Sequence, residues 1–153
     1  DGYLQLNFCR NKNDINADDR VNLVIDSLTT NADSNSPIEY AIDGNSGTRW
    51  ETGRQTQGTY LMAELTNVYT VSGAILELGV SPWDYPENLT ISVSMDGEEW
   101  ATVNAATQDN ERYYFDAVEC RYIRFELGEI QVQAGAHWSV YELRLLTRRD
   151  PNN

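Results

Sequence analysis

Apolar and polar residues alternate along much of the chain with a period of two. The stretch LTISVSM, residues 89–95, places its four apolar side chains on one side of an extended strand and its Thr and Ser side chains on the other. Successive side chains of a strand point to opposite faces, so this pattern predicts a strand with one face buried. The dipeptide Asp96-Gly97 that follows favours a tight turn into a short strand at 100–103.

The same pattern predicts most of the remaining secondary structure. Further strands are expected at 60–65, 71–78, 112–116, 120–127 and 139–146. Residues 21–28 could form another strand, and NADSNSP reads as a loop. We find no helix of about ten residues or more, no repeat and no low-complexity linker. Many short strands separated by turns every 8 to 12 residues or so predict an all-β fold, an antiparallel sandwich or barrel.

Composition and charge narrow the classes of partner. The 153 residues suit a single domain spanning 1–153, and a 41% hydrophobic content with nine tyrosines and four tryptophans can supply a packed core. A formal net charge of −13 argues against nucleic acid and anionic membrane surfaces as partners, because the averaged field repels phosphate groups. A cation or a neutral ligand fits better.

The chain contains no apolar run near the ~20 residues that span a bilayer, and DGYLQLNFCRNK lacks a signal-peptide pattern. We therefore expect a soluble domain, or a mature or excised piece of an exported protein. Cys9 and Cys120 lie too far apart in sequence for a paired zinc or redox motif. A disulfide and two buried free thiols both stay open.

The stretch AIDGNSGTRW, residues 41–50, carries the first candidate chemistry. Hard cations such as Ca²⁺ take about six to eight oxygen ligands, and Asp43, Asn45 and Thr48 offer side-chain oxygens within one tight loop. An EF-hand is excluded, because Arg54 stands at the twelfth position where that motif needs a bidentate glutamate. Taken alone, Asp-Gly-Asn between strands is also an ordinary turn sequence.

The surrounding sequence bears on that choice. Five stretches follow in order, namely AIDGNSGTRW, YLMAEL, ISVSMDGEEW, RYIRFEL and SVYELRLL. This order resembles the discoidin or coagulation-factor type C family, in particular its family 32 carbohydrate-binding modules. The family pattern A-[IF]-D-G-[DN]-x-x-T-x-W is complete in residues 41–50. The resemblance covers roughly residues 25–147.

The resemblance implies a β-sandwich jelly roll with one structural Ca²⁺. The implied ligands are the Tyr40 carbonyl, Asp43, Asn45, Thr48, the Tyr141 carbonyl and Glu142. The residues themselves support the last of these. Tyr141 and Leu143 fall on the apolar face of the final strand, which leaves Glu142 on the other face, free to meet an ion.

Two loops are candidates for a ligand site, because each carries aromatic residues that do not continue a strand pattern. SPWDYPEN, residues 81–88, contains Trp83 and Tyr85, and GAHWS, residues 135–139, contains His137 and Trp138. An exposed aromatic ring can lie against the apolar face of a sugar while nearby polar groups bind its hydroxyls. In family 32 an aromatic residue just before the final strand stacks on the sugar, and Trp138 occupies that place. We therefore expect Trp138 to be the main stacking residue.

The sequence also departs from the galactose-binding members of the family. Those members tend to carry a histidine directly after the motif tryptophan and a second aromatic residue three positions on, where this chain has Glu51 and Arg54. The usual arginine of the loop before the S-x-D-G strand is replaced by the Trp83-Asp84-Tyr85 cluster. Whether terminal galactose specificity is retained therefore stays open. The remaining candidate contacts are Glu51, Arg54, Asp84, Tyr85, Asn88 and His137.

Catalysis has little support in the sequence. The chain has one histidine and none of the triad, zinc-hydrolase or phosphate-binding motifs, and neither Asp18-Asp19 nor Glu98-Glu99 makes a natural acid/base couple. We expect a monomeric, non-catalytic module that targets a secreted, periplasmic or surface protein to a glycan, alongside catalytic or other modules of the same parent chain. A discoidin-like domain for protein or phospholipid binding and a structural spacer domain are the alternatives.

Overall fold

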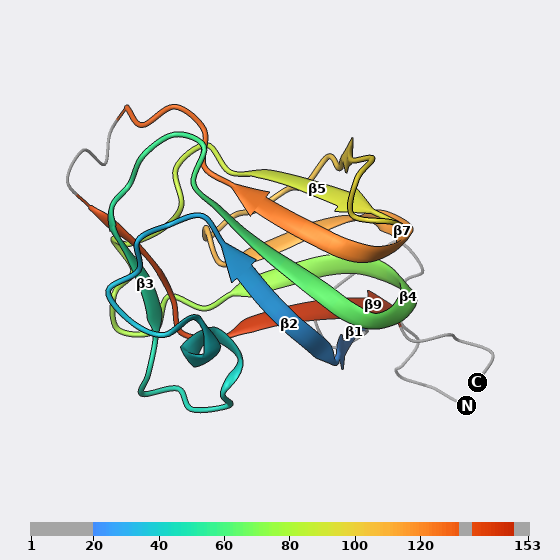
Figure 1. Cartoon of the computed structure of the whole chain (residues 1–153), viewed down its shortest axis with the longest axis horizontal. Coiled ribbons are helices and arrows are strands. Elements are labelled where there is room, and N and C mark those ends of the chain that lie inside the picture. The colour runs from blue at the N-terminus through green and yellow to red at the C-terminus, as the bar shows by residue number, and fades with distance from the viewer. Residues whose placement is uncertain (1–19, 132–135, 149–153) are drawn as a thin grey trace, which may run out of the picture.

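The computed structural model describes residues 20–131 and 136–148, and almost all of the regular structure in them is β-strand (Figure 1). The elements are β1 (Arg20–Leu23), β2 (Ile25–Thr30), a short 3₁₀ helix η2 (Ile38–Ile42), β3 (Trp50–Arg54), β4 (Tyr60–Leu76), β5 (Thr90–Ser94), β6 (Ala101–Thr102), β7 (Arg112–Glu126), β8 (His137–Val140) and β9 (Leu143–Arg148).

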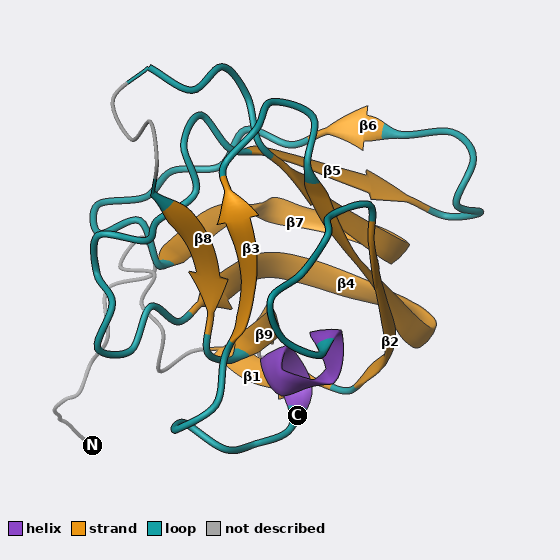
Figure 2. Cartoon of the chain, turned by 60° about the vertical axis from the view of Figure 1, so that its left-hand side comes forward, coloured by secondary structure: helices purple, strands orange, loops and turns teal. Residues whose placement is uncertain are grey.

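The strands form one large and one small antiparallel sheet. The large sheet has the order β1-β9-β4-β7-β5-β6, with β2 paired to the first half of β4, and the small sheet consists of β3 and β8. Figure 2 shows the small sheet lying across the large one. Every strand pair is antiparallel, as short strands joined by turns predict. The predicted all-β class and antiparallel β-sandwich are confirmed.

Two long strands replace four predicted short ones. The stretches expected at 60–65 and 71–78 are the two halves of β4, and those at 112–116 and 120–127 are the two halves of β7. Residues 66–70 are exposed, so the alternation stops there, yet the pairs Tyr69 with Cys120 and Thr70 with Glu119 continue the backbone ladder. Loss of alternation marks a change in burial here and not the end of a strand.

Two predicted strands are each divided into two in the structure, and one observed strand, β3, was not predicted. The stretch expected at 139–146 splits at Tyr141 and Glu142 into β8 and β9, which pair with different sheets. The stretch 21–28 splits at Val24 into β1 and β2. β3 has no clear alternation because its ladder contains a register shift between Glu51 and Arg54.

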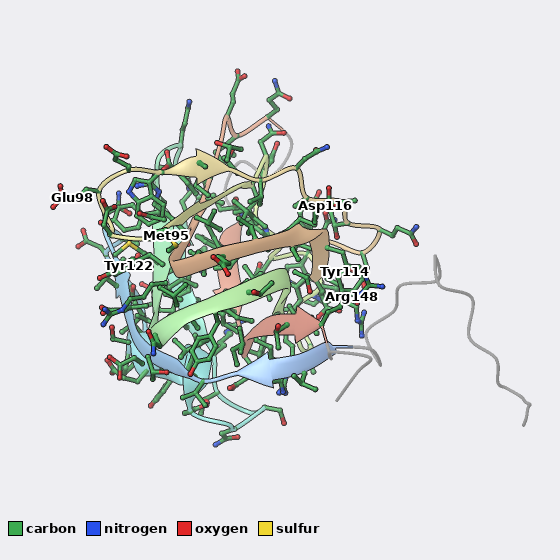
Figure 3. All side chains as sticks on the ribbon, turned by 90° about the vertical axis from the view of Figure 1, so that its right-hand side faces the viewer. Met95, Glu98, Tyr114, Asp116, Tyr122 and Arg148 are labelled. Atoms are coloured by element: carbon green, nitrogen blue, oxygen red, sulfur yellow. The ribbon has the colours of Figure 1, made fainter. Side chains whose placement is uncertain are left out.

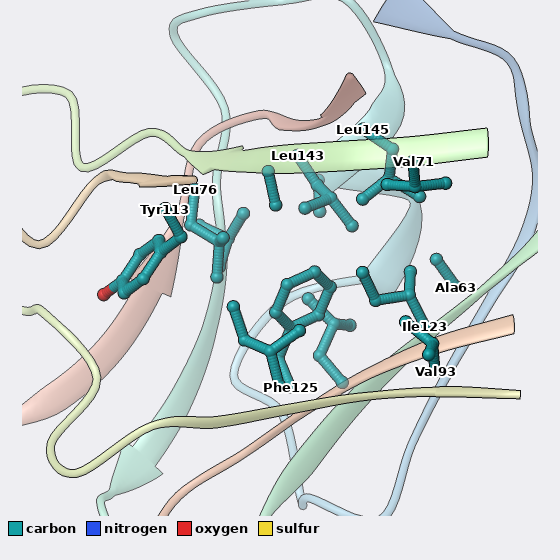
Figure 4. Packing of buried hydrophobic residues seen from close by; sticks show 14 of the residues in the cluster. Ala63, Val71, Leu76, Val93, Tyr113, Ile123, Phe125, Leu143 and Leu145 are labelled. Carbon is teal, nitrogen blue, oxygen red and sulfur yellow. The ribbon is translucent and has the colours of Figure 1, made fainter. Parts of the chain in front are cut away.

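Residues of both sheets form the core, and Figure 4 labels part of the contribution of the large sheet. The small sheet contributes Trp50 and Trp138, and the large sheet contributes residues such as Ile123 and Phe125, all with no exposed surface. Cys120 is also fully buried, and burial raises the pKa of its thiol to about 11. Cys9, its partner in the possible disulfide, lies outside the described residues. None of the described helices is long and apolar enough to cross a membrane.

Candidate functional site

The Asp-Gly-Asn loop after η2 is built by side chains that bond to their own backbone. Asp43 Oδ1 accepts a hydrogen bond from the Asn45 N–H at 3.0 Å, and Asn45 Oδ1 accepts one from the Gly47 N–H at 2.8 Å. The Thr48 hydroxyl donates to Asp43 Oδ2. Gly44 has a φ of 72°, which glycine adopts without strain. Successive Asx turns thus gather the carboxylate, amide and hydroxyl oxygens of three residues in one loop.

Glu142 reaches this loop from the corner between β8 and β9. Its Oε1 accepts a hydrogen bond from the Gly44 N–H at 3.2 Å, although the two residues are 98 positions apart. Burial raises the pKa of the Glu142 carboxyl, and the nearby carboxylates of Asp43 and Glu77 raise it further, against the lowering effects of the Gly44 bond and Arg144. A carboxylate held beside another carboxylate and a set of hard oxygen donors suits a divalent cation.

The two predicted carbonyl ligands belong to residues on either side of this loop. Tyr40 lies in η2 and Tyr141 lies at the corner that carries Glu142. Within the described residues, no three acidic, histidine or cysteine side chains group as a metal site. The predicted site does not need such a group, because two carboxylates are joined by amide, hydroxyl and carbonyl oxygens. The residues present therefore fit a calcium ion, and its binding stays a prediction.

Trp138 is fully buried, which contradicts its predicted role as the main stacking residue. Its ring meets that of Trp50 edge to face, with centroids 5.1 Å apart and an interplanar angle of 76°. A side chain with no exposed surface cannot lie against a sugar. Its place in the alternation gives the reason, since β8 begins at His137 and Trp138 therefore shares the inward face with Val140.

A different set of side chains covers the outward side of the small sheet. Glu51 pairs with Ser139, and Arg54 pairs with His137 two residues earlier on β8. From Glu51 to Arg54 the chain advances three residues along β3, while the paired residues on β8 are only two positions apart. This extra residue forms a bulge, which places Glu51 and Arg54 on the same face as His137. His137 Nδ1 lies 3.4 Å from Glu51 Oε2. We call Glu51, Arg54 and His137 the polar face.

Arg49, which the sequence did not single out, ties this sheet to the loop 81–88. Its guanidinium lies 3.1 Å from Glu51 Oε2, 2.7 Å from Ser81 Oγ and 3.5 Å from Asp84 Oδ2. The side chain also lies against the ring of Tyr141, 5.7 Å from its centroid. These partners are 32 to 92 residues away, except for Glu51, so no local motif could reveal them.

Asp84 anchors the loop and does not face solvent. Only 7% of it is exposed, its carboxylate accepts a hydrogen bond from the Ser139 hydroxyl at 2.7 Å, and its carbonyl accepts one from the Ser139 N–H at 3.1 Å. The prediction that Asp84 contacts a ligand is therefore corrected to a structural role. A buried carboxylate that is used by Ser139 and Arg49 has little left to offer a sugar.

Gln55 fixes the loop 81–88 through hydrogen bonds of its side chain. Its side chain is buried, donates to the carbonyls of Tyr85 at 2.8 Å and His137 at 3.2 Å, and accepts a hydrogen bond from the Glu87 N–H at 3.1 Å. Tyr85 is half-buried. Asn88 has a φ of 51° and its side-chain amide donates to the Glu129 carbonyl at 2.7 Å, so its side chain shapes a turn.

Trp83 is the exposed aromatic residue of the site, with 63% of its surface accessible. It precedes Asp84, whose bonds fix the loop to β8, and it therefore lies on a loop that the fold holds in place. The ring and the polar face together offer what a sugar needs, an apolar plane and planar hydrogen-bonding groups. Of the predicted ligand contacts, only Trp138 and Asp84 are buried. Trp83, Glu51, Arg54, His137, Tyr85 and Asn88 keep exposed surface, although the Asn88 amide is bonded to the Glu129 carbonyl.

Comparisons with known proteins agree with this fold. The family model of the F5/8 type C domain matches residues 25–143. A search of curated protein sequences gave no match. Among solved structures, the CBM32 of AlyQ in complex with 4,5-unsaturated mannuronic acid has a TM-score of 0.65 and 23% identity, over 82% of this chain and 97% of that one.

Two further structures are similar. Chitosan-binding module 1 of a chitosanase/glucanase from Paenibacillus sp. IK-5 has a TM-score of 0.62 and 24% identity, over 78% of this chain and 92% of that one. CpGH89CBM32-5 from Clostridium perfringens, in complex with GalNAc-β-1,3-galactose, has a TM-score of 0.62 and 19% identity, over 77% of this chain and 94% of that one. At such identities these structures establish the fold alone. The family match covers most of the sequence, and the chain belongs to the F5/8 type C domain family.

Proposed function

We propose that the chain is a non-catalytic glycan-binding module whose ligand lies on the polar face against Trp83. The observation that carries this proposal is Trp83, 63% exposed on a loop that is bonded to β8. An apolar ring beside planar polar groups matches the two kinds of surface that a pyranose presents. The similar structures named above include modules solved with bound sugars.

Each part of the proposed site has a separate task. The Trp83 ring covers the apolar face of one sugar residue. Glu51 accepts hydrogen bonds from hydroxyls and His137 offers a ring nitrogen, while Arg49 holds the Glu51 carboxylate in place at 3.1 Å. The polar groups lie on the hydrogen-bonded strands β3 and β8, and hydrogen bonds fix the loop that carries Trp83 to β8. The site therefore loses little conformational entropy when a glycan binds.

A structural Ca²⁺ is the second part of the proposal. Asp43, Asn45, Thr48 and Glu142 would hold it, together with the carbonyls of Tyr40 and Tyr141. The ion would supply charge compensation between two facing carboxylates and would fix the loop to the β8–β9 corner. It contributes stability and does not contact the glycan, because its ligands lie at the start of β3, whereas Arg54 and His137 lie at the opposite end of the small sheet (Figure 2).

Such a module raises the local concentration of a linked domain on its substrate. We propose that it acts outside the cytoplasm, as part of a longer secreted, periplasmic or surface protein that acts on glycans. Tethering converts the second encounter into an intramolecular one, which increases overall binding without any new contact.

Replacing Trp83 with alanine is expected to lower glycan affinity about tenfold or more, because a central aromatic anchor carries much of the binding energy. Binding is measured on a glycan array and then by affinity electrophoresis in gels containing the best polysaccharide. The matched control is Met95→Ala, which truncates another exposed apolar side chain, 53% accessible, on the hairpin after β5. If both variants bind like the wild type, the proposed site is wrong.

The exposed pair Val80 and Trp83, at 81% and 63%, also supports a second candidate, insertion of the loop into a lipid surface. The net charge of −13 opposes this on anionic membranes. Sedimentation with anionic liposomes separates the two candidates. We expect the protein to stay in the supernatant, and clear co-sedimentation that Trp83→Ala removes would favour lipid binding.

A further inference from the structure

Arg54 differs from most other arginines of the described residues in its surroundings. Ion pairs within 4.0 Å engage five of them, namely Arg49, Arg112, Arg121, Arg124 and Arg144. Arg54 is exposed, and no ion pair or hydrogen bond engages its side chain within residues 20–131 and 136–148. The chain has 24 acidic and 11 basic residues, yet none of the carboxylates in the described part of the chain forms an ion pair with this guanidinium on the polar face.

The neighbours of Arg54 place its charge on the polar face, close to the loop that carries Trp83. Arg54 pairs across the strands with His137, so the two side chains share the outward face of the small sheet. Gln55, the next residue, is bonded to the Tyr85 carbonyl, which fixes the loop of Trp83 beside the end of β3. Glu51 does not neutralise Arg54, because its carboxylate is engaged by Arg49 at 3.1 Å and by His137 at 3.4 Å.

We propose that Arg54 binds an acidic group of the glycan, the carboxylate of a uronic acid or a sulfate ester. This inference rests on the proposed function and names the ligand class of the same site. A guanidinium presents parallel N–H donors that match the two oxygens of either group, and such a charge-assisted pair is stronger than a bond to a hydroxyl. Trp83 then covers the sugar ring while Arg54 selects the acidic substituent.

The test measures affinity for a charged polymer and for its neutral counterpart. The probes are polygalacturonate, polymannuronate and polyguluronate, each beside its carboxyl-reduced form, together with carrageenan, which carries sulfate and no carboxylate. The variant is Arg54→Gln. The control is Arg148→Gln, which makes the same charge change at an exposed arginine on the side of the molecule shown in Figure 3, whereas β3 lies at the opposite side in Figure 1.

We expect wild-type protein either to bind at least one uronate polymer more tightly than its reduced form or to bind carrageenan. Arg54→Gln should lower that affinity about tenfold without changing affinity for the neutral form, and Arg148→Gln should change neither. A response to carrageenan alone would identify the sulfate ester as the acidic group.

Equal binding of every uronate polymer and its reduced form together with no binding of carrageenan, or equal losses of affinity for charged and neutral polymers in Arg54→Gln, would overturn the inference. Neutral glycans that bind in a Trp83-dependent manner would then leave the proposed function intact. If neither the polymers nor an array of glycans binds at all, both the inference and the proposed function fail.

Discussion

Replacing Trp138 with alanine is expected to lower the free energy of unfolding by about 3 to 5 kcal/mol, the usual cost of removing a large aromatic side chain from a core. The residue has no exposed surface and packs edge to face on Trp50, so the change leaves a cavity between the two sheets. Urea denaturation followed by far-UV circular dichroism measures the effect without relying on tryptophan fluorescence.

Two further variants make this prediction specific. Trp138 Nε1 is buried without a hydrogen-bond partner among the described residues, so Trp138→Phe removes an unsatisfied donor and keeps the aromatic contact. It should cost clearly less stability than alanine. Trp83→Ala, at an exposed site, should stay within about 0.5 kcal/mol of the wild type. A stable Trp138→Ala protein that had lost only glycan binding would restore the stacking role that the fold contradicts.

Removing calcium is expected to lower the melting temperature. A ligand that binds only the folded state adds about 2.7 kcal/mol at one hundred times its Kd and about 4.1 kcal/mol at one thousand times. A thermal scan with EDTA, repeated after adding back excess Ca²⁺, measures the loss and its recovery. Glycan affinity should change only as far as the folded fraction changes.

Asp43→Asn tests which residues hold the ion. The amide keeps the size of the side chain and removes the charge that the ion needs, so the variant should show little difference between EDTA and Ca²⁺. Asp116→Asn makes the same charge change at an exposed residue far from the loop and should keep the full calcium response (Figure 3). A wild-type melting curve that EDTA leaves unchanged would count against the calcium site.

The sequence predicted the parts of the molecule that local patterns determine. The Asp-Gly-Asn loop follows from Asx turns among neighbours. Glu142 lies between the buried residues Tyr141 and Leu143, as the alternation predicted, although it stands at the corner between β8 and β9 and not within a strand. The all-β class follows from alternation. Each of these depends on residues within a few positions of one another, which is what a single sequence records.

The remainder of the site depends on contacts that are distant along the chain. Arg49 meets Ser81 and Tyr141, and Asp84 meets Ser139, through the packing of a loop against a two-stranded sheet. The predicted strand begins at 139 and leaves Trp138 in a loop, whereas β8 begins at His137, so Trp138 lies within the strand and its ring points inward. Residues three positions apart lie on opposite faces of a regular strand, so the alternation does not predict that Glu51 and Arg54 share a face. The bulge in β3 brings them to the same face.

The central claim is that a glycan binds against Trp83, and the four tryptophans of the chain allow a direct measurement. The indole N–H signals of Trp50, Trp83, Trp100 and Trp138 can be followed by NMR while the best-binding oligosaccharide from the array is added. Trp50 and Trp138 are buried and Trp100 stacks on Arg124 at 4.2 Å, so only the Trp83 signal should shift strongly. A strong shift at Trp100 with Trp83 unchanged, or no shift with any glycan tested, would contradict the account.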